Sequence, residues 1–129
     1  MHQSRYQTGL EKLTEIDGDV GHQVIESLKN VCPDLAKYTI EFPFGDIYSR
    51  PGLDLKSREI ATVAALTAMG HCAPQLKVHV NAALNVGCTT EEVKETVLQM
   101  AVYAGFPAAL NGMFVVKEVL IERGLMPAP

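Results

Sequence analysis

The sequence lacks the features that mark membrane and secreted proteins. Its longest apolar run, residues 60–69, has about ten residues, whereas a helix that spans a bilayer needs roughly 20. The amino-terminal stretch MHQSRYQTGLEKLTE contains no apolar core of a signal peptide. We therefore expect a cytoplasmic protein without a membrane partner.

The sequence also lacks a cluster of basic residues. Its formal net charge is −4, so a surface that neutralises nucleic-acid phosphates is not expected. What remains is ordinary for a globular protein, with 47% hydrophobic and 20% charged residues in a chain of 129. We expect a single domain that covers residues 1–129.

Cysteine is scarce, and its spacing excludes the common cysteine frameworks. Cys32, Cys72 and Cys88 are odd in number and far apart, and no C-x-x-C occurs. This pattern argues against a disulfide framework, a zinc knuckle and a dithiol redox motif. His71 and His79 stand eight residues apart, which matches no common metal site, so we expect no metal.

Alternating strand patterns bounded by hairpin turns are missing as well, and the apolar spacing is helical almost throughout. The sequence therefore predicts an all-α fold whose short connections favour antiparallel neighbours. We expect helices over residues 3–16, 21–31, 55–70, 74–87, 89–105 and 107–123, with two short helical pieces within 34–48. The helix at 55–70 is apolar nearly all round beyond Glu59, which predicts a central, buried helix.

His79 is the first candidate for chemistry. On a helical wheel it lies beside the stripe of Leu76, Val80 and Ala83, inside the buried arc and away from the side of Asn81. One interpretation is a core histidine whose ring nitrogens are satisfied by neighbours. The other is a general acid or base that works near neutral pH.

Glu59 is the second candidate, because it precedes the apolar run of its helix. It shares a face with Val63 and Leu66, which should point to the core. Its place near a helix start favours a first-turn charge stabilised by the helix dipole. The alternative is a partner for a buried base, in which case Glu59 and His79 would form a proton-handling pair.

Three features leave alternatives open. Free cysteines such as Cys72 and Cys88 are usually small buried hydrophobes, but Cys72 precedes a helix start, where a thiolate is stabilised. Arg50 follows the predicted pieces in a turn and could anchor a carboxylate. The small residues of MAVYAGFPAALNG, residues 100–112, fit tight helix packing, a pocket wall or a subunit interface.

Three segments in this order resemble the carboxymuconolactone decarboxylase family: RPGLDLKSREIATVAALTAMG, PQLKVHVNAALNVG and TTEEVKETVLQMAVYAGFPAALNGM. The resemblance covers residues 6–123, nearly the whole chain. It implies an all-α subunit of the alkylhydroperoxidase D-like type with about six to eight helices. It also implies a homo-oligomer, a hexamer or a trimer.

The activity that the resemblance implies is loss of carbon dioxide from 4-carboxymuconolactone, a small carboxylated lactone of aromatic catabolism, without any cofactor. By the same resemblance His79 is the acid or base, Glu59 assists it, and Arg50 is a candidate clamp for the substrate carboxylate. Gln75 and Cys72 are candidate substrate-binding residues near the mouth of the pocket.

The related peroxidase branch uses C-x-x-C followed three residues later by histidine. Counted back from His79, Cys72 takes the first cysteine position, but Gln75 stands at the second. A dithiol cycle needs a partner sulfur, so we do not expect that cycle here. The alternative function is a thiol-dependent antioxidant role through Cys72. A third possibility is a helical oligomer with another small-molecule role or no catalytic one.

Overall fold

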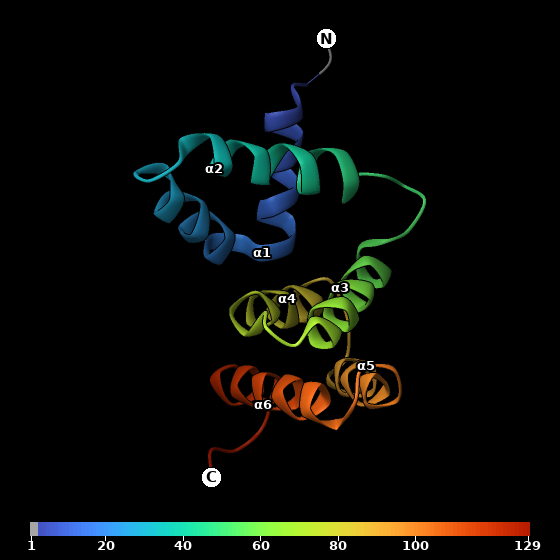
Figure 1. Ribbon diagram of the computed structural model, residues 1–129. Helices are drawn as coiled ribbons and strands as arrows, with labels where there is room; N and C mark the ends of the chain where they lie inside the picture. The colour runs from blue at the N-terminus through green and yellow to red at the C-terminus, as the bar shows by residue number, and fades with distance from the viewer. Residues whose placement is uncertain (1–2) are drawn as a thin grey trace. The chain divides into compact units, whose positions relative to one another are not determined.

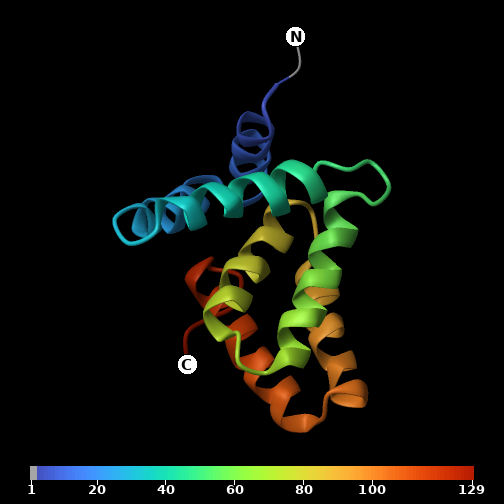
Figure 2. The ribbon, with the colours of Figure 1, turned by 45° about the horizontal axis from the view of Figure 1, so that its top comes forward.

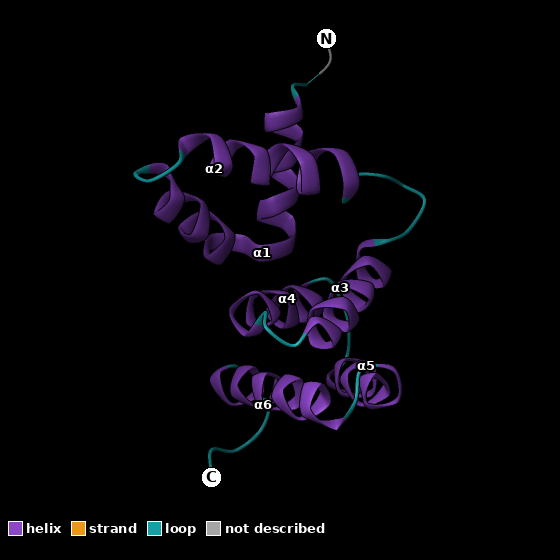
Figure 3. Ribbon diagram, in the orientation of Figure 1, coloured by secondary structure: helices purple, strands orange, loops and turns teal. Residues whose placement is uncertain are grey.

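The computed structural model describes residues 3–129, and Figure 3 shows that every regular element in that range is a helix. Six α-helices and one π-helix occur there, without a strand, which confirms the all-α prediction and its number of helices. The chain divides into two compact units, one through Leu55 and one from Lys56 to Pro129. Each unit is described by itself below.

The first unit begins with α1, Arg5–Lys29, whose start is capped by Ser4. The Ser4 hydroxyl accepts a hydrogen bond from the backbone N–H of Gln7 at 3.0 Å. Gly18 (φ 58°, ψ −142°) interrupts the helix with a backbone conformation that glycine adopts most readily. The two helices predicted at 3–16 and 21–31 are the two halves of this kinked α1.

The short helices α2, Pro33–Thr39, and η1, Ile40–Ile47, complete the first unit and confirm the two predicted helical pieces. Element η1 is a π-helix: the N–H of Tyr48 donates to the carbonyl of Pro43 at 2.7 Å. Since a proline inside an α-helix clashes with the carbonyl four residues earlier, the wider π turn accommodates Pro43. The guanidinium of Arg5 ties α1 to η1 through two-pronged hydrogen bonds to Asp46.

The second unit holds four α-helices in succession, which Figures 1 and 2 show as two pairs joined by short turns. They are α3, Leu55–Met69, α4, Ala73–Asn85, α5, Thr90–Tyr103, and α6, Phe106–Glu122. Glycines with positive φ stand in all three connections, at Gly70, Gly87 and Gly105. A capping box begins α5, with Thr89 and Glu92 each bonded to the other's backbone N–H.

One apolar cluster forms the core of the second unit. Its members come from all four helices and from the turn before α5: Val63, Leu76, Val80, Ala83, Cys88, Val93, Val97, Val115, Val116, Val119 and Leu120. Short β-branched side chains dominate it, so the helices pack closely. At Gly112 the approach is closest, because a Cβ there would lie 2.8 Å from Cγ2 of Thr67.

The burial of α3 differs from the prediction. Only Glu59, Val63 and Thr67 are buried, a single stripe at intervals of four residues. Alanines on the other faces, such as Ala61 and Ala65, are exposed. Within the second unit α3 is therefore buried along one stripe only, and the prediction of burial nearly all round is wrong there.

None of the helices in residues 3–129 combines the length and the apolar character that crossing a membrane demands.

Candidate functional site

Glu59 is a fully buried acidic residue of the second unit. It lies in the second turn of α3, at the head of the buried stripe, and its side chain is 0% exposed. Taking a carboxylate out of water costs several kcal/mol unless partners compensate for the lost hydration. A buried glutamate in a core of valines therefore calls for a specific partner.

That partner is His79, in the second turn of α4. Its Nδ1 lies 2.9 Å from Oε1 of Glu59, and the His79 side chain is 20% exposed. Since a carboxylate only accepts hydrogen bonds, Nδ1 carries the hydrogen and donates it. The contact fixes the orientation of the His79 ring.

The second carboxylate oxygen of Glu59 also bears on the role of this residue. Oε2 is buried and has no hydrogen-bond partner among residues 3–129. A buried acceptor left without a donor lowers stability by about 1–3 kcal/mol. An arrangement that costs stability and orients a titratable ring is typical of functional sites.

Both site residues singled out from the sequence are thus brought together. The structure places Glu59 beside His79 and not as an exposed first-turn charge; a proton-handling role of the pair stays a prediction. Val80 and Ala83 are buried whereas the His79 side chain is 20% exposed, so His79 lies at the border of the buried arc and not inside it as predicted. The stripe that Glu59 shares runs through Val63 to Thr67, whereas Leu66 is only partly buried.

Cys72 and Gln75 lie at the start of the same helix, α4. Cys72 is the residue before the helix, half-buried, and Gln75 is exposed in the first turn. Cys72 lines a cavity of about 20 Å³ between α3, α4 and α6. That volume holds one water molecule but no lactone, so this cavity gives no support to a substrate contact by Cys72. Contact of Cys72 or Gln75 with a substrate stays a prediction.

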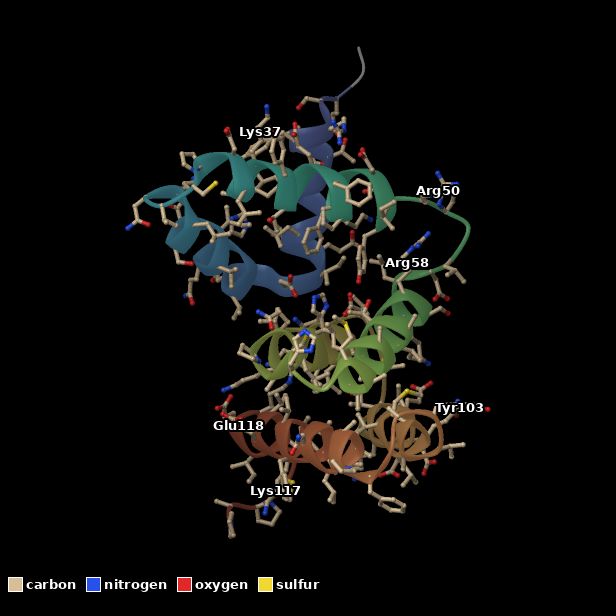
Figure 4. The ribbon with its side chains drawn as sticks, in the orientation of Figure 1. Lys37, Arg50, Arg58, Tyr103, Lys117 and Glu118 are labelled. Atoms are coloured by element: carbon tan, nitrogen blue, oxygen red, sulfur yellow. The ribbon has the colours of Figure 1, made fainter. Side chains whose placement is uncertain are left out.

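Arg50 belongs to the first unit and lies exposed on the connector between η1 and α3, where Figure 4 labels it. Its proposed contact with a substrate carboxylate stays a prediction. No group of three or more histidine, cysteine or acidic side chains within residues 3–129 has the arrangement of a metal site. The absence of a metal likewise stays a prediction.

Thr67 and Asn111 line the cavity beside Cys72 and were not among the site residues predicted from the sequence. The hydroxyl of Thr67 is buried and donates to the carbonyl of Val63 at 2.7 Å. The signal for Thr67 was present, because it follows Glu59 by eight residues and Val63 by four. Asn111 is exposed on α6 and carried no such signal.

Comparison with known proteins bears on this site. The sequence profile described as "Carboxymuconolactone decarboxylase family" matches residues 33–118. The chain is 35% identical over 126 residues to 4-carboxymuconolactone decarboxylase of Acinetobacter baylyi, covering 97% of this chain and 93% of that protein. It is 27% identical over 136 residues to nitrosuccinic acid decarboxylase of Metarhizium robertsii, covering 100% and 92%.

A third relative is an uncharacterised 15.0 kDa protein of Paracoccus denitrificans, from the nqo9–nqo10 intergenic region. It is 31% identical over 124 residues, covering 95% of this chain and 92% of the relative. The family profile spans well over half of the chain, and the similarity to these relatives extends over nearly all of it. The chain therefore belongs to the carboxymuconolactone decarboxylase family.

Proposed function

We propose that this protein is a decarboxylase that removes carbon dioxide from a small carboxylated lactone resembling 4-carboxymuconolactone, without a cofactor. The observation that carries the proposal is the hydrogen bond between His79 and the fully buried Glu59. The relatives named decarboxylases, one of a lactone and one of nitrosuccinic acid, support the reaction class.

The proposed reaction requires the protein to position the substrate and to donate one proton. As the bond between the ring carbon and the carboxylate breaks, its electron pair moves into the conjugated lactone carbonyl and gives a dienolate. Nε2 of protonated His79 then donates its proton to a ring carbon of the dienolate, which gives the product lactone. Neutral His79 then takes up a proton from the solvent, so the net reaction consumes the substrate carboxylate and one proton and releases one carbon dioxide.

Glu59 has two tasks in this scheme. It holds the ring so that Nε2 faces the substrate, and its charge stabilises the imidazolium before the proton is transferred. Because Glu59 reaches the substrate only through His79, it is a positioning residue. Arg50 is proposed to bind the carboxylate of the substrate that is retained in the product.

The test follows carbon dioxide release from 4-carboxymuconolactone with the parent protein and three variants. We expect His79→Asn to lose about 100- to 10,000-fold in kcat, the usual contribution of a positioned acid. Glu59→Gln keeps an acceptor for Nδ1, so it should lose less, through kcat and not through KM. Arg50→Met should raise KM with a smaller effect on kcat.

The control for thiol chemistry is Cys72→Ser, which should keep the parent turnover. Helical content and unfolding midpoints of all variants verify that each is folded. Full turnover in folded His79→Asn would refute the proposal. Loss of turnover in Cys72→Ser together with a thiol-dependent peroxidase activity in the parent would favour the antioxidant alternative instead.

A further inference from the structure

A groove lies between α6, the start of α5 and the tail that follows α6. Its volume is about 310 Å³, within the roughly 300–1,000 Å³ of small-molecule sites. Five apolar side chains line it: Met113, Val116, Leu120, Leu125 and Met126. We call this hollow the carboxyl-terminal groove. It belongs to the second unit and shares no lining residue with the Glu59–His79 pair.

The turn after α6 builds one wall of the groove. Gly124 has a positive φ of 71°, and its N–H donates to the carbonyl of Ile121 at 3.0 Å. The N–H of Leu125 donates to the carbonyl of Leu120 at 2.8 Å. These are the two hydrogen bonds of a Schellman motif, with glycine at its left-handed position. The motif reverses the chain and brings Leu125 and Met126 to the side of α6 that carries Leu120.

The fold uses the apolar lining of the groove only in part. Val116 and Leu120 belong to the core cluster, and Met113 and Met126 are partly buried against it. Leu125 is 52% exposed, although the side chain at this position of the motif frequently packs against the helix. Methionine side chains are flexible and polarisable, so two of them in one groove can adapt to an apolar ligand. The lining therefore suits the hydrocarbon part of a small molecule.

The charged side chains that line the groove are basic. Lys94 and Lys117 lie there together with Thr90, and no acidic side chain of residues 3–129 lines it. Lys117 forms no ion pair with another residue in that range. Nζ of Lys94 lies 3.0 Å from Glu91, but both side chains are exposed, and such pairs contribute little to stability. Lys94 can therefore exchange this partner for an anionic ligand.

The acidic residues of α6 are engaged away from the groove. Glu118 and Glu122 both accept hydrogen bonds from Nζ of Lys77 on α4, each at 2.9 Å. Figure 4 shows Lys117 on the side of α6 that faces the tail and Glu118 on another side. The acids of α6 therefore do not neutralise the positive charge of the groove, although the chain as a whole has a net charge of −4.

We propose that the carboxyl-terminal groove binds a small amphipathic carboxylate. Its hydrocarbon chain lies against Met113, Leu125 and Met126, and its carboxylate lies between Lys94 and Lys117. A compact lactone with several polar oxygens would leave the apolar lining unused, so the ligand is a single carboxylate on a hydrocarbon chain. This site does not depend on the proposed decarboxylation.

The test titrates octanoate into protein that carries carbon-13 in its methionine methyl groups. The chain has five methionines, so the NMR signals report on separate places. Those of Met113 and Met126 should move on binding, whereas that of Met69, at the end of α3 and outside the groove, should not. Acetate, which lacks the hydrocarbon chain, and 1-octanol, which lacks the charge, are the matched probes.

Two substitutions of the same kind test the contribution of charge. Lys117→Gln removes a cation from the groove, and Lys37→Gln makes the same change at an exposed lysine of α2, which Figure 4 labels. We expect Lys117→Gln to weaken octanoate binding about three- to tenfold and Lys37→Gln to leave it unchanged. Leu125→Asn should weaken it too, because the wall loses an apolar side chain. Circular dichroism verifies that each variant is folded.

Octanoate should bind several times more tightly than acetate or 1-octanol, and His79→Asn should bind it like the parent. Shifts confined to methionines outside the groove would overturn the proposal, as would equal binding of 1-octanol. So would a folded Lys117→Gln that binds octanoate no more weakly than Lys37→Gln does. The absence of any shift at millimolar octanoate would overturn it as well, including the case in which another chain covers the groove. Loss of binding in folded His79→Asn would place octanoate at the Glu59–His79 pair instead.

Discussion

At the scale of single residues, the Glu59–His79 pair sets a cost in stability against the function proposed for it. Its carboxylate is fully buried, and only one of its oxygens is bonded within the described part of the chain. Replacing a buried ionic pair by apolar side chains of similar size is often neutral or stabilising, by up to about 4 kcal/mol. If the pair is present for its chemistry, the fold should survive its removal.

The double variant Glu59→Met, His79→Leu tests this. We expect its free energy of unfolding in urea to equal or exceed that of the parent, by up to about 4 kcal/mol, with decarboxylation abolished. Glu59→Met alone leaves Nδ1 of His79 without the carboxylate and should be less stable than the double variant. A double variant less stable than the parent by about 2 kcal/mol or more would mark the pair as a structural element.

At the scale of elements, close approach between helices depends on particular glycines. Gly112 of α6 faces Thr67 of α3 and Val97 of α5, and a Cβ at that position would meet them at 2.8 Å and 3.1 Å. In an exposed helix, exchanging glycine for alanine stabilises by about 0.5–1 kcal/mol. At Gly112 the crowding should instead make the exchange for alanine destabilising.

We expect Gly112→Ala to lower the free energy of unfolding by about 1–3 kcal/mol, the usual cost of overpacking. Thr67→Ala removes two of the three closest atoms, Cγ2 and Oγ1, and should therefore recover part of that loss in the double variant. Chemical denaturation of the four proteins gives the coupling between the two sites. A stabilised Gly112→Ala, or purely additive effects, would contradict the close α3–α6 contact.

The capping box of α5 leads to a second prediction at the scale of elements, on how stability changes at acidic pH. Lys56 Nζ lies 2.8 Å from Glu92, and this hydrogen bond, followed by the one from the backbone N–H of Thr89, lowers the pKa of the Glu92 carboxyl. A carboxyl with a lowered pKa contributes stability above its ordinary pKa of about 4.3. The contribution is lost as the pH falls through the lowered value in the folded protein.

Glu92→Gln removes this titration but keeps an acceptor for Thr89. We expect the parent to be more stable than the variant near neutral pH, and the difference to shrink below about pH 4.3. Urea unfolding over an acidic pH series measures it. Glu95→Gln, on the same helix and outside any ion pair of residues 3–129, is the control; a difference for Glu92→Gln that did not change with pH would contradict the assignment.

At the scale of the whole molecule, local signals in the sequence predicted more than distant ones. The helices depend on neighbours within a few residues, and their ranges were predicted. The contact between Glu59 and His79 depends on how two helices pack, so the sequence left it as one of two alternatives. The predicted burial of α3 nearly all round was wrong within the second unit, because an apolar sequence does not say which faces of a helix are covered.

The π-helix has a consequence for how the length of this chain can vary. In η1 the N–H of Tyr48 reaches back five residues to Pro43, one residue further than in an α-helix. Deleting one residue within 40–47 would shorten that reach to the four residues of an α-helix. Because the wider turn absorbs the extra residue, the chain on either side could then keep its direction. Element η1 is therefore a place where this chain could lose one residue with little change in the direction of the connector that bears Arg50.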